Sequence, residues 1–174
     1  MSTIPNPKLT SRQDIEFISS GITCRGWLTY PAAAANTAVP LVLMAHGFGG
    51  TREMRLEQYA ERFQAAGLAT LIFDYRHFGA SDGLPRDLLI PQREVADWHA
   101  ALAFSRKLPG IDAKRIALWG SSFGGGLVVT VAAQDGNVAA TVSQCPMLDG
   151  LASALEIARY AGPLAMLRVS AHGL

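Results

Sequence analysis

The sequence predicts an α/β protein with a doubly wound, mostly parallel sheet and an antiparallel hairpin at the N-terminus. From residue 41 onward, short apolar runs alternate with amphipathic helical patterns, which is typical of parallel sheets with helices on both faces. The apolar runs lack the alternation of a half-exposed strand, as expected where a strand is covered on both sides. Glycine-rich segments at 46–50 and 120–126 follow two of these runs, at the edge where such sheets bind ligands.

The elements are expected in the following order. Residues 14–30 alternate apolar and polar side chains around Ser20-Gly21, which predicts a hairpin. Gly67 is expected to cap the first helix, and Asp135-Gly136-Asn137 predicts a turn. The remaining strands are expected at 41–45, 68–73, 116–119 and 138–144, and the helices at 53–66, 93–107 and 123–133.

Composition excludes several classes of protein. The 174 residues are 49% hydrophobic and 17% charged, which describes one globular domain. A net charge of +1, without a run of Lys or Arg, argues against a nucleic-acid partner. No apolar stretch approaches the ~18 residues of a membrane span, and residues 1–12 lack an export signal. We therefore expect a soluble, cytoplasmic protein with no membrane partner.

Two cysteines, Cys24 and Cys145, are too few to indicate a disulfide framework. Each lies in a strand-like apolar segment, where a free cysteine is expected to behave as a small hydrophobe. No His, Cys, Asp or Glu cluster has the spacing of metal ligands. We expect neither a metal nor a cofactor.

The most informative segment is Gly120-Ser121-Ser122-Phe123-Gly124, which follows an apolar strand. This Gly-x-Ser-x-Gly pattern is typical of a nucleophile elbow, in which a serine occupies a strained strand-to-helix turn and its neighbours must lack a Cβ. Ser122 has glycine at both −2 and +2, so Ser122 is the candidate catalytic nucleophile. For Ser121 we favour a turn or helix-capping role.

A serine that attacks an acyl carbonyl requires N–H donors for the oxyanion. The candidates are the backbone amides of Phe48 and Phe123. Phe123 begins a helix, where unpaired N–H groups favour negative charge, and the glycines around Phe48 would let its amide approach. Each glycine segment alone is also explained by a tight turn, but their occurrence together at matching strand ends favours a catalytic site.

Three segments, at 46–50, 74–83 and 120–124, together resemble the α/β-hydrolase family over residues 14–150. More narrowly, they resemble its dienelactone-hydrolase-like and X-Pro-dipeptidyl-peptidase-like esterase and peptidase branches. The resemblance implies an α/β-hydrolase core that needs no cofactor. It implies that His46 shapes the oxyanion loop and is not the catalytic base. It also implies that Asp74 and Arg76 stabilise the loop after the second parallel strand, with Ser81 and Gly83 completing its turn, although a solvated polar loop is the alternative.

The catalytic acid and base are harder to place. In this fold the acid and the histidine follow the serine, and the candidates here are Asp149 and His172. Residues 151–169 look helical, with a break at Gly162-Pro163, and contain no run that forms the last two strands. We therefore expect a core that is incomplete at its C-terminus, with the acid and base in a segment beyond residue 174, and a chain that alone is inactive or weakly active. Within this chain we expect a leader at 1–13, the core at 14–150 and the start of a cap or insertion at 151–174. The incomplete core is expected to leave an open sheet edge that is prone to self-association.

Three functions follow from these observations. The leading one is a serine hydrolase that cleaves an ester, thioester, lactone or amide through an acyl-enzyme on Ser122, acting on a small-molecule or peptide acyl substrate. The second is a noncatalytic hydrolase-like fragment that acts by binding. A dinucleotide-binding domain ranks lowest, because Arg52 replaces the third glycine of the required pattern.

Overall fold

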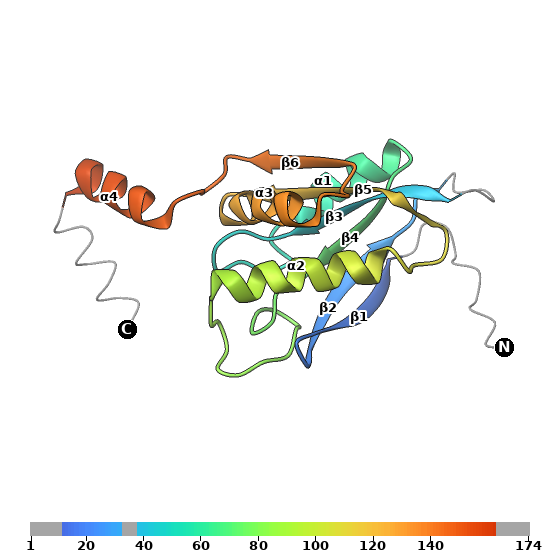
Figure 1. Ribbon diagram of the computed structural model, residues 1–174, viewed down its shortest axis with the longest axis horizontal. Helices are drawn as coiled ribbons and strands as arrows, with labels where there is room; N and C mark the ends of the chain where they lie inside the picture. The colour runs from blue at the N-terminus through green and yellow to red at the C-terminus, as the bar shows by residue number, and fades with distance from the viewer. Residues whose placement is uncertain (1–11, 33–37, 163–174) are drawn as a thin grey trace.

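The computed structural model describes residues 12–32 and 38–162. Within them, the strands form a single sheet in the order β1-β2-β4-β3-β5-β6, surrounded by helices (Figure 1). The strands are β1 (Gln13–Ser19), β2 (Ile22–Thr29), β3 (Val39–Ala45), β4 (Ala69–Phe73), β5 (Ile111–Ser121) and β6 (Ala140–Gln144). The helices are α1 (Leu56–Ala65), α2 (Pro91–Ser105), α3 (Phe123–Asp135) and α4 (Gly150–Ala161).

The sheet combines an antiparallel and a parallel half. β1 pairs with β2, and β2 pairs with β4, in antiparallel fashion. β4, β3, β5 and β6 run parallel to one another. The predicted fold class is therefore confirmed, including the N-terminal hairpin around Ser20-Gly21.

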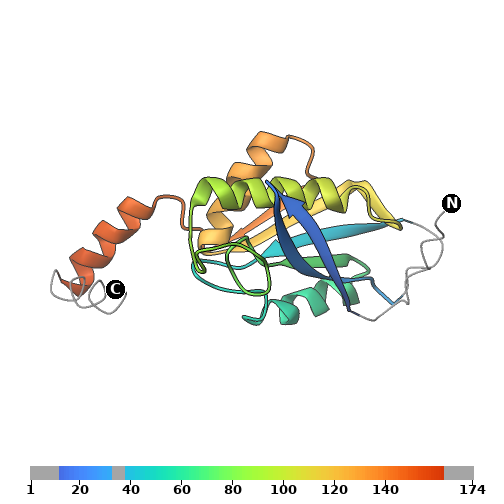
Figure 2. The same cartoon turned by 90° about the horizontal axis from the view of Figure 1, so that it is seen from below.

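Helices cover both faces of the sheet (Figure 2). On one face α1 packs its buried Leu56 and Ala60 against Met44 and Trp119. On the other face α2 and α3 cover the larger core, which includes Phe73, Trp98 and Val128. Because the central strands are buried on both sides, their sequences read as continuous apolar runs.

Most element boundaries agree with the prediction to within two residues, and two differ by more. The first helix begins at Leu56 instead of residue 53, because Arg55 adopts a left-handed conformation with φ 61° that interrupts helical geometry. β5 begins at Ile111, where it pairs with Val39, so the polar residues before Ile116 also belong to the strand. Gly67 follows α1 with φ 85°, as its predicted capping role requires.

α4 stands apart from the remainder of the fold. It extends away from the sheet in both views (Figures 1 and 2) and buries none of its residues. The helix ends before Gly162, as the sequence predicts; the helical residues expected after it lie outside the described part of the chain. None of the helices in the described part is long and apolar enough to cross a lipid bilayer.

The two cysteines differ in their surroundings. Cys24 is fully buried in β2, as predicted, and burial raises the pKa of its thiol to about 12. The prediction for Cys145 is wrong: it is exposed, with φ 43°, immediately after β6. The chain turns away from the sheet there, so an apolar neighbourhood in sequence does not become a buried one.

Candidate active site

Ser122 lies on strained backbone between β5 and α3. Its φ of 55° and ψ of −120° fall outside the regions that a serine normally adopts. The serine is exposed and occupies the N-cap position of α3, yet its side chain makes no capping hydrogen bond. Its backbone is fixed on both sides, since its N–H donates to the Gln144 carbonyl at 2.9 Å and its carbonyl accepts from Met147 at 2.9 Å. The hydroxyl is therefore presented to solvent by a rigid turn.

The glycines around Ser122 are required by close backbone contacts. A methyl group on Gly120 would overlap the Gly124 carbonyl oxygen and lie 2.5 Å from its carbonyl carbon. A methyl group on Gly124 would lie 2.6 Å from the His46 carbonyl oxygen. Both distances are far below van der Waals contact, so the spacing that predicts the elbow has the expected steric cause.

The loop after β3 lies against the elbow. A methyl group on Gly47 would lie 3.4 Å from Ser122 Cβ and 3.9 Å from the Phe123 nitrogen. The Phe48 and Phe123 rings meet edge to face, with centroids 6.0 Å apart. The first helical hydrogen bond of α3 runs from Gly126 to Ser122, so the Phe123 amide belongs to the unpaired first turn. The two candidate oxyanion donors thus come from neighbouring segments beside Ser122.

His46 is buried beneath this loop. Its Nδ1 lies 3.0 Å from the Gly47 carbonyl oxygen, and because a carbonyl only accepts, Nδ1 is the donor. Burial lowers the pKa of His46, opposed by the Gly47 carbonyl and by Asp74, so the ring is neutral at physiological pH. This geometry supports the loop-shaping role that the family resemblance implies.

The loop after β4 is held by buried hydrogen bonds and is not a solvated polar loop. The buried Asp74 carboxylate accepts from the amides of Arg52 at 2.6 Å and Ala80 at 3.0 Å. The Ser81 hydroxyl donates to the Asp74 carbonyl at 2.7 Å. Gly83, with φ 123°, faces the His77 ring so closely that a methyl group would lie 2.6 Å from Nδ1. Asp74 therefore stabilises the loop, and Ser81 and Gly83 complete its turn, as the family resemblance implies.

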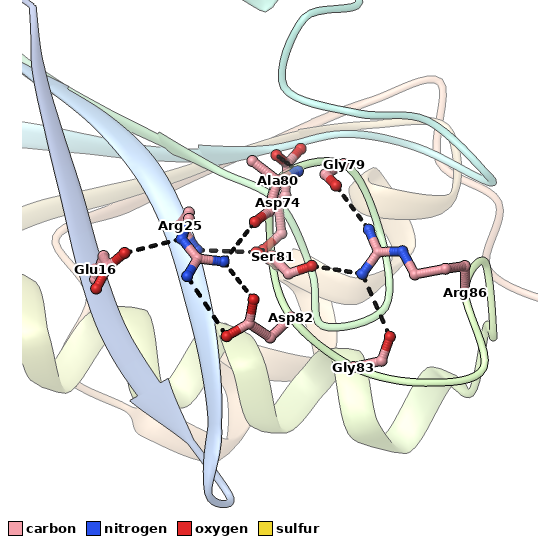
Figure 3. A network of polar contacts seen from close by, with 9 residues as sticks. All are labelled: Glu16, Arg25, Asp74, Gly79, Ala80, Ser81, Asp82, Gly83 and Arg86. Carbon is pink, nitrogen blue, oxygen red and sulfur yellow. Dashed lines mark hydrogen bonds and ion pairs between the residues drawn. The ribbon is translucent and has the colours of Figure 1, made fainter.

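Two arginines brace the outside of this loop (Figure 3). Arg25 of β2 donates to the Ala80 carbonyl at 2.7 Å and pairs with both Glu16 and Asp82. Arg86 donates to the carbonyls of Gly79 and Ser81 at 2.6 Å. The Arg25 guanidinium lowers the pKa of Asp82. Neither arginine was identified from the sequence, because their partners are backbone carbonyls and residues distant along the chain.

Arg76 reaches the opposite side of the loop and forms a buried ion pair with Asp97 of α2. Its Nη2 lies 2.7 Å from Asp97 Oδ1, and its backbone N–H donates to Oδ2 at 3.0 Å. It also donates to the Ser19 hydroxyl at 2.7 Å. The predicted stabilising role of Arg76 is borne out by these contacts, which join the loop, β1 and α2.

A cavity of about 540 Å³ opens beside Ser122. The apolar and aromatic part of its wall is formed by Phe48, Met54, Leu56, Tyr59 and Trp119. Its size suits a small-molecule substrate. The candidate nucleophile itself lines the cavity.

Of the predicted acid and base, only Asp149 lies in the described part of the chain, and its hydrogen bonds there are to α4 and not to Ser122. Asp149 is exposed and caps α4, accepting from the Ala152 amide at 2.9 Å, and His172 lies outside the described residues. His99, on α2, contacts Gln134 at 2.8 Å.

Ser121, expected in a turn or cap, is instead the last residue of β5 and pairs with Gln144. Across the described ranges, no three His, Cys, Asp or Glu side chains are grouped to hold a metal ion.

Comparisons with known proteins identify relatives of this chain. The sequence model of the family described as serine aminopeptidase, S33, matches residues 36–170. The chain is 49% identical over 144 residues to the quorum-quenching protein AidA of Acinetobacter baumannii, covering 83% of this chain and 47% of AidA. It is 36% identical over 145 residues to a thiohydrolase of Eupenicillium brefeldianum, covering 83% of this chain and 46% of that protein.

Solved structures share the fold. The crystal structure of the α/β-hydrolase GrgF from Penicillium sp. sh18 superposes with a TM-score of 0.75 at 32% identity, covering 93% of this chain and 53% of that one. The chain spans about half the length of the curated relatives that it matches.

Proposed function

The chain belongs to the serine aminopeptidase S33 family of α/β-hydrolases, and we propose that it is a serine hydrolase that forms an acyl-enzyme on Ser122. The reaction cleaves an ester, thioester, lactone or amide. The observation that carries the proposal is Ser122 itself, an exposed serine without a capping bond, held at φ 55° between a strand and a helix. Such strain persists where the surroundings enforce it, and it is concentrated at functional sites.

In the proposed mechanism, Ser122 Oγ attacks the carbonyl carbon of the substrate and loses its proton to a base. The amides of Phe48 and Phe123 donate to the oxyanion of the tetrahedral intermediate, and each donor of this kind is worth about 3 kcal/mol of barrier. Collapse expels the alcohol, thiol or amine, which takes up the proton. Water then releases the acyl group. Asp149 and His172 remain the acid and base candidates of this sequence.

The substrate proposal is a neutral acyl group, either small or peptidic. The apolar and aromatic part of the cavity wall beside Ser122 supports it, although Arg55 and Gln58 also line the cavity. The thiohydrolase relative supports a thioester as the first substrate to test. Within the family, assignment to the dienelactone-hydrolase-like or X-Pro-dipeptidyl-peptidase-like branch also stands as a proposal.

A noncatalytic binding role is the second candidate, and the state of the described histidines favours it. His46 is buried and bonded to the Gly47 carbonyl, His77 is buried, and His99 contacts Gln134. None of these three forms a hydrogen bond with Ser122 in the part of the chain that the structure describes, so a base would have to come from elsewhere.

Acyl-enzyme capture tests the proposal. The chain is mixed with p-nitrophenyl acetate or with the S-acetyl thioester of N-acetylcysteamine. The reaction is quenched in acid, and the intact mass of the protein is measured by mass spectrometry. Because weak activity is expected of this chain, the reagent is used in excess over a long incubation; we then expect one acetyl group on the wild type and none on Ser122→Ala, with Ser121→Ala as the matched control that retains it. His172→Ala and Asp149→Asn show whether these residues supply base and acid. A wild type that neither acquires an acetyl group nor turns over either substrate contradicts the hydrolase proposal and favours binding.

A further inference from the structure

The 46–52 loop is attached at both ends to two consecutive residues that follow β4. We propose that Tyr75 and Asp74, here called the loop anchor, are positioning residues that hold the Phe48 amide in place beside Ser122. The inference rests on the proposed hydrolase function, because that function gives the Phe48 amide its task.

Tyr75 holds the start of the loop. Its hydroxyl donates to the His46 carbonyl at 3.3 Å, and its ring packs edge-on against the His46 ring with centroids 4.5 Å apart. Trp98 Nε1 donates to the Tyr75 oxygen at 2.9 Å. Since the Tyr75 oxygen already accepts a hydrogen bond from the Trp98 indole, its own hydroxyl proton is free to point toward the His46 carbonyl oxygen. Burial raises the pKa of Tyr75, so the proton is retained.

The His46 carbonyl is also where the loop touches the elbow. Gly124 lies so close to it that a methyl group there would be 2.6 Å from the oxygen. The next residue, Gly47, faces Ser122 Cβ, and Phe48 follows. Rotation of the His46 peptide would therefore displace the Phe48 amide relative to Ser122. A displacement of about 1 Å from a catalytic geometry can cost roughly 100-fold in rate.

Asp74 holds the end of the loop. Its Oδ1 accepts from the Arg52 amide at 2.6 Å, and its Oδ2 lies 3.3 Å from Arg52 Nε. The Arg52 guanidinium also stacks on the Trp27 ring, 4.4 Å from its centroid. Between the two anchored ends, Gly49 has φ 61° and Phe48 is 69% exposed. The Gly47 carbonyl accepts from Gly50 at 3.3 Å and lies 3.0 Å from His46 Nδ1, and the Thr51 carbonyl accepts from Met54 at 3.0 Å. These bonds are local, whereas the anchor ties the loop to the segment after β4.

Tyr75→Phe tests the anchor, and Tyr30→Phe is its matched control. Tyr30 donates to the Pro109 carbonyl at 2.6 Å, so both variants lose a buried hydroxyl bonded to a backbone carbonyl. Tyr75→Phe also leaves the Trp98 Nε1 donor without its acceptor, so it is expected to cost more stability than Tyr30→Phe. The rate of hydrogen–deuterium exchange in the 46–52 peptide measures directly whether the anchor holds the loop, and this measurement requires no activity. The rate at which a fluorophosphonate phosphonylates Ser122 measures the effect of the anchor on reactivity. Thermal unfolding confirms that both variants are folded.

We expect exchange in 46–52 to accelerate in Tyr75→Phe and to stay unchanged in Tyr30→Phe. The maximal phosphonylation rate of Tyr75→Phe should fall about 10-fold, with the half-saturating reagent concentration unchanged. Unchanged exchange, or faster exchange with an unchanged maximal rate, overturns the inference. Failure of the hydrolase proposal is seen separately, as a wild type that does not react, while the exchange measurement still decides whether the anchor exists.

Discussion

The backbone of Gly120 lies against that of Gly124, so that a methyl group on Gly120 would lie 2.5 Å from the Gly124 carbonyl carbon. Gly120→Ala forces the end of β5 away from the first turn of α3. We expect the free energy of unfolding to fall by about 3 kcal/mol, measured by urea denaturation. Gly150→Ala is the control, because nothing lies within 4 Å of its added methyl group. Equal stability of the two variants would contradict the steric account of the elbow.

The Arg76–Asp97 ion pair should stabilise the protein far more than an exposed pair. Asp97→Asn leaves the Arg76 guanidinium, only 5% exposed, without a compensating charge, and we expect a loss of about 3 kcal/mol. Asp112→Asn removes the partner of Arg115, a largely exposed pair, and should cost less than about 1 kcal/mol. Urea denaturation of both variants measures the difference. Similar losses would show that burial of the pair is not decisive.

Glu94 makes stability depend on pH. Burial, with a smaller contribution from Asp97, raises the pKa of Glu94 from 4.5 to about 8, and its carboxylate oxygens have no hydrogen-bond partner among the described residues. Between these two values the folded state keeps a proton that the unfolded state has lost. The free energy of unfolding therefore falls as pH rises, by up to about 1.4 kcal/mol per pH unit. This stabilisation is complete below pH 4.5 and is lost as pH passes about 8.

Glu94→Gln replaces the carboxyl with a group that does not titrate. We expect the stability of the variant relative to wild type to increase steadily from pH 5 to pH 8, measured by urea denaturation at each pH. Glu61→Gln makes the same change at an exposed position of α1 and should show no such trend. A wild-type-to-variant difference that is constant across this range for Glu94→Gln would rule out the proposed titration.

β6 is an edge of the described sheet, and Val142 on it is 47% exposed. Unpaired strand edges favour association, and lysine on an edge strand opposes it. We expect concentration-dependent self-association in analytical ultracentrifugation, weakened by Val142→Lys. Ile18→Lys makes the same kind of change on the opposite edge strand β1 and shows whether association uses that edge instead. A wild type that stays monomeric, or equal dissociation by both variants, would contradict association through β6.

The sequence predicts those features that depend on local rules. Gly120, Ser122 and Gly124 satisfy a steric requirement within five residues, and the apolar runs of β3 and β4 report burial on both faces. The roles of Asp74 and Arg76 follow from the resemblance of residues 74–83 to the α/β-hydrolase family, because no local rule distinguishes them from a solvated polar loop.

Features that depend on distant partners were not predictable. Tyr75 follows the same strand as Asp74, but its role requires the His46 carbonyl and Trp98, which only folding brings together. Glu94 reads as an ordinary polar residue of an amphipathic helix, yet the fold buries it. The polar residues at the start of β5 are not predictable from hydrophobicity, because they form a strand by backbone pairing of Ile111 with Val39.

The central claim is that the strained elbow makes Ser122 the reactive serine of this chain, even at the weak activity expected where the acid and base are incomplete, and site-mapped fluorophosphonate labelling tests it most directly. The 174-residue chain is treated with the probe, digested, and every modified serine is assigned by mass spectrometry, beside Ser122→Ala and Ser121→Ala. The account predicts a label on Ser122 alone, which Ser122→Ala abolishes and Ser121→Ala retains. A chain that stays unlabelled, or a label that spreads to exposed serines or persists in Ser122→Ala, would contradict it.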